Sequence, residues 1–141
     1  MRRFAILFAG FVLLAACDEA PKQEAKSDGK AQLSLELVDV SYEFRDGRHT
    51  YDHNRLFTET GGVGVNITRG KVCVMNGADC VDALVKYRVD ASKTLLQKGH
   101  HVASPRAQDT ITLHYWAQDD AGNKFELHKV LKTDGNKVVF E

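Results

Sequence analysis

Two cysteines on either side of an Asn-Gly pair place the strongest constraint on how this chain can fold. Cys73 and Cys80 flank Asn76-Gly77, a dipeptide that favours a two-residue type I′ hairpin turn. Such a turn opposes the two cysteines, and directly opposed antiparallel residues lie about 4.5 to 5.5 Å apart at Cα, within disulfide range. The sequence predicts a structural disulfide that contributes about 2.5 kcal/mol in the chain-entropy model. The Cys-x-x-Cys spacing of redox-active pairs is absent.

Most of the remaining chain alternates apolar and polar residues with a period of two, which is typical of half-buried strands. Leu33, Leu35 and Leu37 begin this pattern. Turn sequences such as Asp46-Gly47 and Asp134-Gly135 separate its segments. The pattern predicts strands over 33–44, 63–67, 72–74, 81–89, 111–117, 125–131 and 137–140.

Two phase changes in the alternation predict irregularities. The apolar parity switches near Leu37, and a hairpin at Asn76-Gly77 puts the apolar residues of 63–67 out of phase with those of 85–89 unless an extra residue lies at Arg69-Gly70. We therefore expect a bulge near each position. No stretch predicts a long helix. The best candidate, Ala91 to Gln97, is short, and Asp90-Ala91-Ser92 fits the start of a turn equally well.

These patterns predict an all-β chain that forms an antiparallel sandwich or a partly open barrel, with one hairpin disulfide. The stretch Tyr115-Trp-Ala-Gln-Asp-Asp-Ala-Gly-Asn123 resembles the Tyr-x-Ala-x-Asp-x-Ala-Gly-Asn segment of bacterial immunoglobulin-like domains. There this segment closes a strand with a tight turn. The resemblance implies an immunoglobulin-like fold and carries no functional information.

The N-terminus has the features of an export signal. Arg2 and Arg3 precede thirteen apolar or small residues, which are too few for a transmembrane helix. This run leads directly into Cys17, which completes the tetrapeptide Leu14-Ala15-Ala16-Cys17. This tetrapeptide resembles the lipobox of bacterial lipoproteins, which implies cleavage before Cys17, a diacylglycerol on its sulfur and an acylated amine, commonly with palmitate. Asp18 resembles the inner-membrane retention signal of enterobacterial lipoproteins. An outer-membrane destination stays open, as does a cleaved, secreted protein without lipid.

Three segments follow from this interpretation: a signal peptide over 1–16, a lipidated cysteine with a flexible tether over 17–31, and one periplasmic β-rich domain over 32–141. The tether has no large apolar side chain and holds the domain roughly 20 Å from the bilayer. Without residues 1–16 the chain has 17 basic and 19 acidic residues. Because the basic residues are scattered, we expect no nucleic-acid partner.

No motif for a cofactor, a metal ion or a catalytic group stands out. His49 and His53 lie between turn signals and are interpreted as loop residues, and His100 and His101 are adjacent and point to opposite faces of a strand. The glycine-rich segment Thr60 to Val65 lacks the lysine of a phosphate loop. Asp119, Asp120 and Asn123 fit a turn better than a calcium loop.

The function favoured by these features is non-enzymatic protein binding by a membrane-anchored domain. The candidate interaction residues are Trp116, Tyr115 and His114, since an exposed tryptophan is a common interface anchor. The second layer of a sandwich could equally bury Trp116. The partner is expected to be an envelope protein or an incoming protein, as in the entry-exclusion proteins of conjugative elements or in toxin immunity. The alternative is a ligand-binding or hydrolytic lipoprotein with a pocket formed by loops 49–55 and 98–106.

Overall fold

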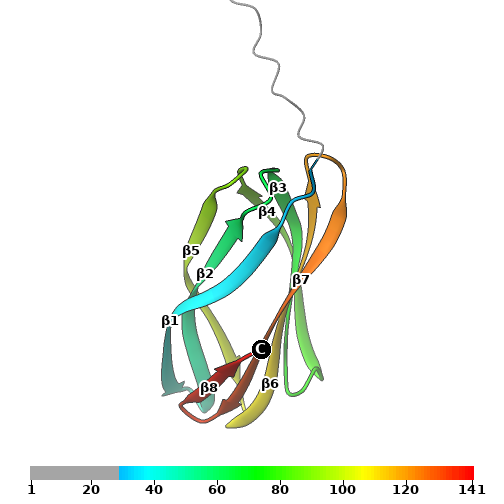
Figure 1. Ribbon diagram of the computed structural model, residues 1–141. Helices are drawn as coiled ribbons and strands as arrows, with labels where there is room; N and C mark the ends of the chain where they lie inside the picture. Colours follow the sequence, from blue (N-terminus) through cyan, green and yellow to red (C-terminus); the bar gives the residue numbers. More distant parts are fainter. Residues whose placement is uncertain (1–28) are drawn as a thin grey trace, which may run out of the picture.

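The computed structural model describes residues 29–141, and the predictions for the signal peptide and Cys17 lie outside this range. Its secondary structure consists of strands (Figure 1): β1 (Leu33–Arg45), β2 (Arg48–Glu59), β3 (Val65–Val74), β4 (Asp79–Val89), β5 (Thr94–Ser104), β6 (Gln108–Asp119), β7 (Lys124–Asp134) and β8 (Lys137–Phe140). No helix within residues 29–141 is long and apolar enough to cross a membrane.

The strands form two antiparallel sheets that pack face to face. A three-stranded sheet has the order β1-β2-β5, and a five-stranded sheet has the order β4-β3-β6-β7-β8 (Figure 1). In an immunoglobulin sandwich, strands A, B and E share one sheet and C, F and G share the other. Strands β1, β2 and β5 take the first set of places, β3, β6 and β7 take the second, and β4 pairs with β3. The predicted all-β sandwich is confirmed.

The hairpin formed by β3 and β4 has the predicted register. Cys73 opposes Cys80, Val74 opposes Asp79, and the two cysteines form a disulfide. Asn76 and Gly77 have φ values of 54° and 88°, the left-handed backbone that a type I′ turn requires at both central residues. This bond ties the edge strand β4 to the sheet.

Both predicted bulges are present, close to their expected positions. The register of β1 with β2 shifts between Val38 and Ser41, where Asp39 has a φ of 54°. The register of β3 shifts between Ile67 and Arg69 against both of its neighbours. Because of the second shift, the apolar residues before and after it face the same side of the sheet.

The loops expected at 49–55 and 98–106 are wrong, whereas the turn considered at Asp90-Ala91-Ser92 is present. Residues 49–55 belong to strand β2, and 98–104 to strand β5. The helical candidate Ala91 to Gln97 starts with a turn, in which the N–H of Lys93 donates to the carbonyl of Asp90, and continues into β5. Polar side chains concealed the strand pattern, because β2 points His53 and Arg55 toward the core.

The core lies between the two sheets and is centred on aromatic rings. Phe57 of β2 and Tyr115 of β6 meet edge to face, with ring centroids 5.3 Å apart and planes at 88°, an arrangement that aromatic pairs favour. A Cβ atom at Gly70 would lie 2.9 Å from Cε1 of Tyr115. Glycine at this position therefore lets β3 pass directly beneath the tyrosine ring.

Buried carboxylates join the loops at the ends of the sandwich. Glu59, which is 2% exposed, accepts hydrogen bonds from four backbone N–H groups that lie outside regular pairing. The donors are Gln32 at 3.0 Å, Gly61 at 2.6 Å, Gly62 at 3.0 Å and Ser92 at 2.8 Å. Asp109 accepts from Met75 and Asn76, and Asp119 from Ala31 and Asn123. Each carboxylate thus joins segments that are distant in sequence.

We predict that Glu59→Gln destabilises the fold by about 2 to 3 kcal/mol at neutral pH, because an amide cannot accept from all the buried donors. Burial by itself would raise the pKa of Glu59, but the hydrogen bonds from the N–H donors lower this pKa by more than burial raises it. The pKa of Glu59 is therefore below 4.5. The stabilisation is therefore complete above pH 4.5 and is lost as the pH falls through the lower pKa of the folded state. Urea unfolding at several pH values measures both effects.

The matched control for this measurement is Glu36→Gln, which alters an exposed glutamate on β1. It should change the free energy of unfolding by less than about 0.5 kcal/mol. If the two variants lose the same stability at every pH, the assigned role of Glu59 is wrong.

Candidate functional site

The outer face of the five-stranded sheet carries two rows of side chains that run across β4, β3, β6 and β7. Alternate residues of each strand point away from the core, and the pairing registers bring them side by side. We call these two rows the cross-strand patch. The first row is Leu84, Arg69, Trp116 and Glu126, and the second is Asp82, Lys71, His114 and His128.

Trp116 lies at the centre of the patch between charged and aromatic neighbours. The guanidinium carbon of Arg69 is 4.4 Å from the centre of its ring system, a cation–π contact. Asp82 holds Arg69 in place, since its Oδ1 accepts from Nε at 2.9 Å and lies 2.8 Å from a terminal nitrogen. The imidazole of His114 packs 3.6 Å from the ring of Trp116.

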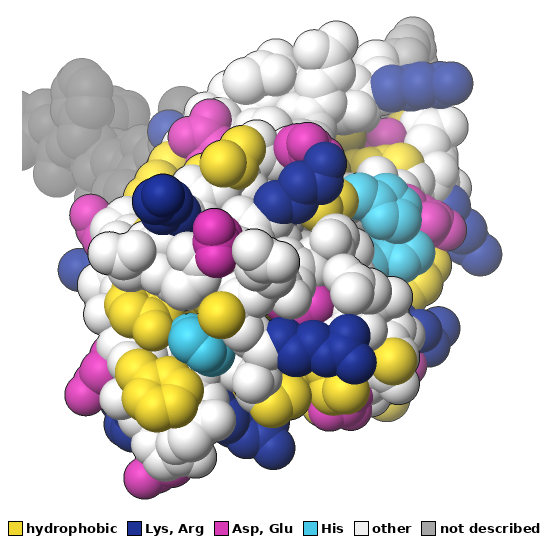
Figure 2. Space-filling view, turned by 90° about the horizontal axis from the view of Figure 1, so that it is seen from below, with side chains coloured by type: hydrophobic (Ala, Val, Ile, Leu, Met, Phe, Trp, Pro, Cys, Tyr) yellow, Lys and Arg dark blue, Asp and Glu magenta, His cyan; other side chains and the backbone are white. Residues whose placement is uncertain are grey.

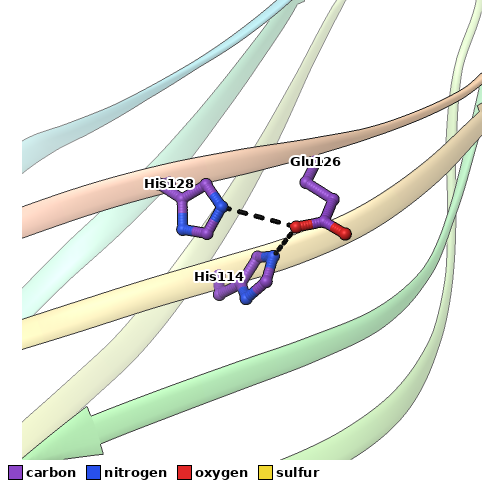
Figure 3. Close-up of side chains that lie close together, drawn as sticks. All are labelled: His114, Glu126 and His128. Atoms are coloured by element: carbon purple, nitrogen blue, oxygen red, sulfur yellow. Dashed lines mark hydrogen bonds and ion pairs between the residues drawn. The ribbon is translucent and has the colours of Figure 1, made fainter. Parts of the chain in front are cut away.

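His114, Glu126 and His128 form a cluster (Figure 3), and His114 also packs against Trp116. Nε2 of His114 lies 2.8 Å, and Nε2 of His128 3.5 Å, from the same carboxylate oxygen of Glu126. The two imidazoles are stacked with their centroids 3.8 Å apart. The hydrogen bond from His114 is the main cause that lowers the pKa of Glu126, so the carboxylate is charged over a wide pH range.

This cluster has the chemistry of a metal-ligand set. Two imidazoles and one carboxylate form a common donor set for transition metals. The three ligand atoms all lie within 4.8 Å of one another, and among residues 29–141 no other histidine, cysteine or acidic side chains form such a group of three. The cluster is therefore the candidate metal site within residues 29–141.

One open hollow adjoins the patch, and a second lies away from it. The one beside Trp116 and Glu126 has a volume of about 410 Å³ and is also lined by Thr68, Lys124 and Phe125. The other has about 320 Å³ and lies at the open edge of the sandwich, where Val72, Val81 and Val102 supply an apolar lining.

Figure 2 shows one end of the molecule, where acidic and basic side chains are interspersed and do not form a surface of one charge.

Of the three predicted interaction residues, the structure places two on the outer face of the sheet and one in the core. His114 and Trp116 lie together on the outer face. Tyr115, however, is 2% exposed and points into the core, so its predicted place on the interaction surface is wrong. Successive residues of a strand point to opposite faces, and Tyr115 stands between the other two.

Sequence reasoning missed Arg69, Glu126 and His128. A turn at residues 119–123 joins β6 and β7, and its register opposes His114 to His128 and Trp116 to Glu126. Counting outward from this turn would have brought the histidines together. Arg69 was harder to find, because the bulge between Ile67 and Arg69 decides which face it occupies.

The two histidines of β2, His49 and His53, do not lie in the loop that the sequence predicted. The ring of His53 is buried, and its Nδ1 lies 3.1 Å from the carbonyl oxygen of Tyr51. Burial is the main cause that lowers the pKa of His53. Nδ1 of His49 lies 2.9 Å from the hydroxyl of Tyr42. The predicted exposed loop histidines are thus strand residues with protein partners.

No protein-family model matches this sequence, and no curated protein matches it. Among solved structures it resembles a Bordetella pertussis structural-genomics target with the provisional name ApaA protein, at a TM-score of 0.54 and 14% identity over 79% of this chain and 92% of that one. It also resembles the structural-genomics target SoR45, at 0.51 and 8% identity over 81% and 85% of the two chains. These likenesses show the fold alone.

We predict opposite outcomes for neighbouring truncations in β6. Tyr115→Ala should cost about 3 to 5 kcal/mol because it empties the core. Trp116→Ala should cost about 1 kcal/mol or less, because it removes contacts made at the surface. Chemical denaturation measures both, and Tyr115→Phe, which keeps the ring, is the control. Equal losses for the two alanine variants would contradict the assignment of faces.

Proposed function

We propose that this protein is an inner-membrane-anchored periplasmic lipoprotein that acts as a non-enzymatic protein-interaction module. The observation that carries this proposal is the cross-strand patch with Trp116 at its centre. Tryptophan and arginine are enriched among the residues that dominate binding energy in protein interfaces. Here Arg69 already packs over the tryptophan ring at 4.4 Å, so both are oriented before a partner arrives.

The position of the patch supports this role. It lies on β-strands, which hold side chains more rigidly than loops do, and the Cys73–Cys80 disulfide ties β4 to β3 next to it. Rigid presentation reduces the conformational entropy that is lost on binding. The exposed Leu84, with 91% of its surface accessible, extends the patch to the edge strand and adds apolar area that a partner can cover.

The proposed lipid anchor would confine the domain to the membrane surface. A lipidated Cys17 followed by a flexible tether leaves the folded domain roughly 20 Å from the bilayer. A domain held in this way can meet a membrane-embedded protein or a protein that arrives through the envelope. Exclusion of incoming conjugative elements and immunity to a periplasmic toxin are two roles that suit this architecture.

The alternative proposal, a ligand-binding or hydrolytic lipoprotein, is favoured by the convergence of His114, Glu126 and His128. Sites for small molecules usually enclose most of the ligand. This cluster instead lies on an outer sheet face, where 49% of the Glu126 side chain and 60% of the His128 side chain are accessible. The geometry therefore supports protein binding better.

We predict that crosslinking and pull-down of the lipidated protein from membrane fractions captures a specific protein, identified by mass spectrometry. Trp116→Ala should reduce its recovery at least tenfold, because loss of an interface anchor costs about 2 kcal/mol or more. Leu96→Ala, which truncates an exposed apolar residue on the other sheet, is the matched control and should leave recovery unchanged.

Cys17→Ser separates the effect of the anchor from that of the patch. If the partner lies at the membrane, this variant should lose the crosslink although its patch is intact. Equal recovery with Trp116→Ala and with the unaltered protein would show that the patch is not the interface. Capture of a small molecule in place of any protein would favour the alternative proposal.

A further inference from the structure

We infer that His114, Glu126 and His128 form a binding site for a divalent transition-metal ion of the Zn²⁺ type, with three protein ligands and one position open to solvent. The inference concerns metal chemistry and goes beyond the proposed protein-binding function. It rests on the convergence, the charge and the rigidity of the three side chains.

The ligand atoms already have nearly the spacing that a metal needs. Ligands at Zn–N and Zn–O distances of about 2.0 to 2.1 Å in a tetrahedron are separated by about 3.3 Å. The Glu126 oxygen lies 2.8 Å from Nε2 of His114 and 3.5 Å from Nε2 of His128. Both imidazole nitrogens point toward this oxygen in Figure 3. Both separations are within about 0.5 Å of this value, and all three ligand atoms lie within 4.8 Å of one another. Coordination of one ion also requires the two stacked imidazoles to tilt apart.

The charge of the cluster favours a cation. Within residues 29–141, Glu126 contacts His114 and His128 and forms no ion pair with a lysine or an arginine. Arg69, the nearest arginine along its row, is paired with Asp82. A divalent ion would therefore neutralise a carboxylate that has no cationic lysine or arginine partner in the described part of the chain.

The cluster is held in place before any metal binds. His114 and His128 are directly opposed on neighbouring strands, and the ring of His114 packs against both Trp116 and His128 at centroid distances of 3.6 and 3.8 Å. Packing that fixes the rotamer of a ligand lowers the entropy lost on coordination. A site built on two paired strands is more rigid than one built on loops.

The donor set selects the class of ion. Imidazole nitrogen suits Zn²⁺, Cu²⁺ and Ni²⁺, whereas Mg²⁺ and Ca²⁺ require oxygen ligands. Three protein ligands leave one tetrahedral position for water or another ligand, as in zinc sites that are not purely structural. The accessible surface of Glu126 and His128 leaves this position reachable from solvent.

Titration of the full chain with ZnCl₂ tests the inference, with Cys17→Ser in every sample so that no free thiol competes. Isothermal titration calorimetry should give one ion per chain. Trp116, the one tryptophan in the sequence, should report the same event through its fluorescence because it contacts His114. MgCl₂ should produce neither signal. His114→Asn, Glu126→Gln and His128→Asn should each weaken Zn²⁺ binding at least tenfold.

His101→Asn is the matched control, since it removes an exposed histidine from the other sheet and should leave the affinity unchanged. Circular dichroism of each variant verifies that the sheet is intact, and His128→Asn, which alters an exposed side chain, provides the test if another variant fails to fold. No binding of Zn²⁺, or equal binding by the His128→Asn and unaltered proteins, would overturn the inference. Neither outcome bears on the pull-down of a protein partner.

Discussion

Antiparallel pairing of β6 with β3 on one side and β7 on the other is the constraint on which the rest of the structure depends. The side chains of β6 alternate, so one face of the strand supplies Leu113 and Tyr115 to the core and the other presents His114 and Trp116 to solvent. A slip of one residue would exchange these two sets. The same register therefore fixes both the hydrophobic core and the candidate site.

Hydrogen bonding at the ends of the sandwich complements this pairing. Loops contain backbone N–H groups without a strand partner, and leaving such groups buried and unsatisfied is costly. Glu59, Asp109 and Asp119 accept from several of them. Each carboxylate loses hydration on burial, but several hydrogen-bond donors, which include the Ser104 hydroxyl at Asp109, compensate and lower its pKa. Negatively charged side chains thus become structural elements of a β-rich domain.

The outer face of the larger sheet combines two chemistries that share His114. This residue packs against Trp116, the proposed interface anchor, and also directs Nε2 toward Glu126 in the proposed metal site. An ion bound there would lie beside any protein that covers the tryptophan. The two proposals are nonetheless independent, because one depends on the surface formed by the half-buried Trp116 and by Arg69 and the other on three convergent ligand atoms.

The sequence by itself determined the strand-rich fold class, the hairpin with its Cys73–Cys80 disulfide and the approximate positions of both bulges, because these follow from alternation and turn chemistry within short segments. It did not reveal β2 and β5 as strands, because polar residues such as His53 and Gln97 interrupt their apolar pattern. Only the tertiary structure decided that Arg69 lies beside Trp116. The physical reason is that lateral neighbours in a sheet depend on pairing between segments distant in sequence, which local patterns do not specify.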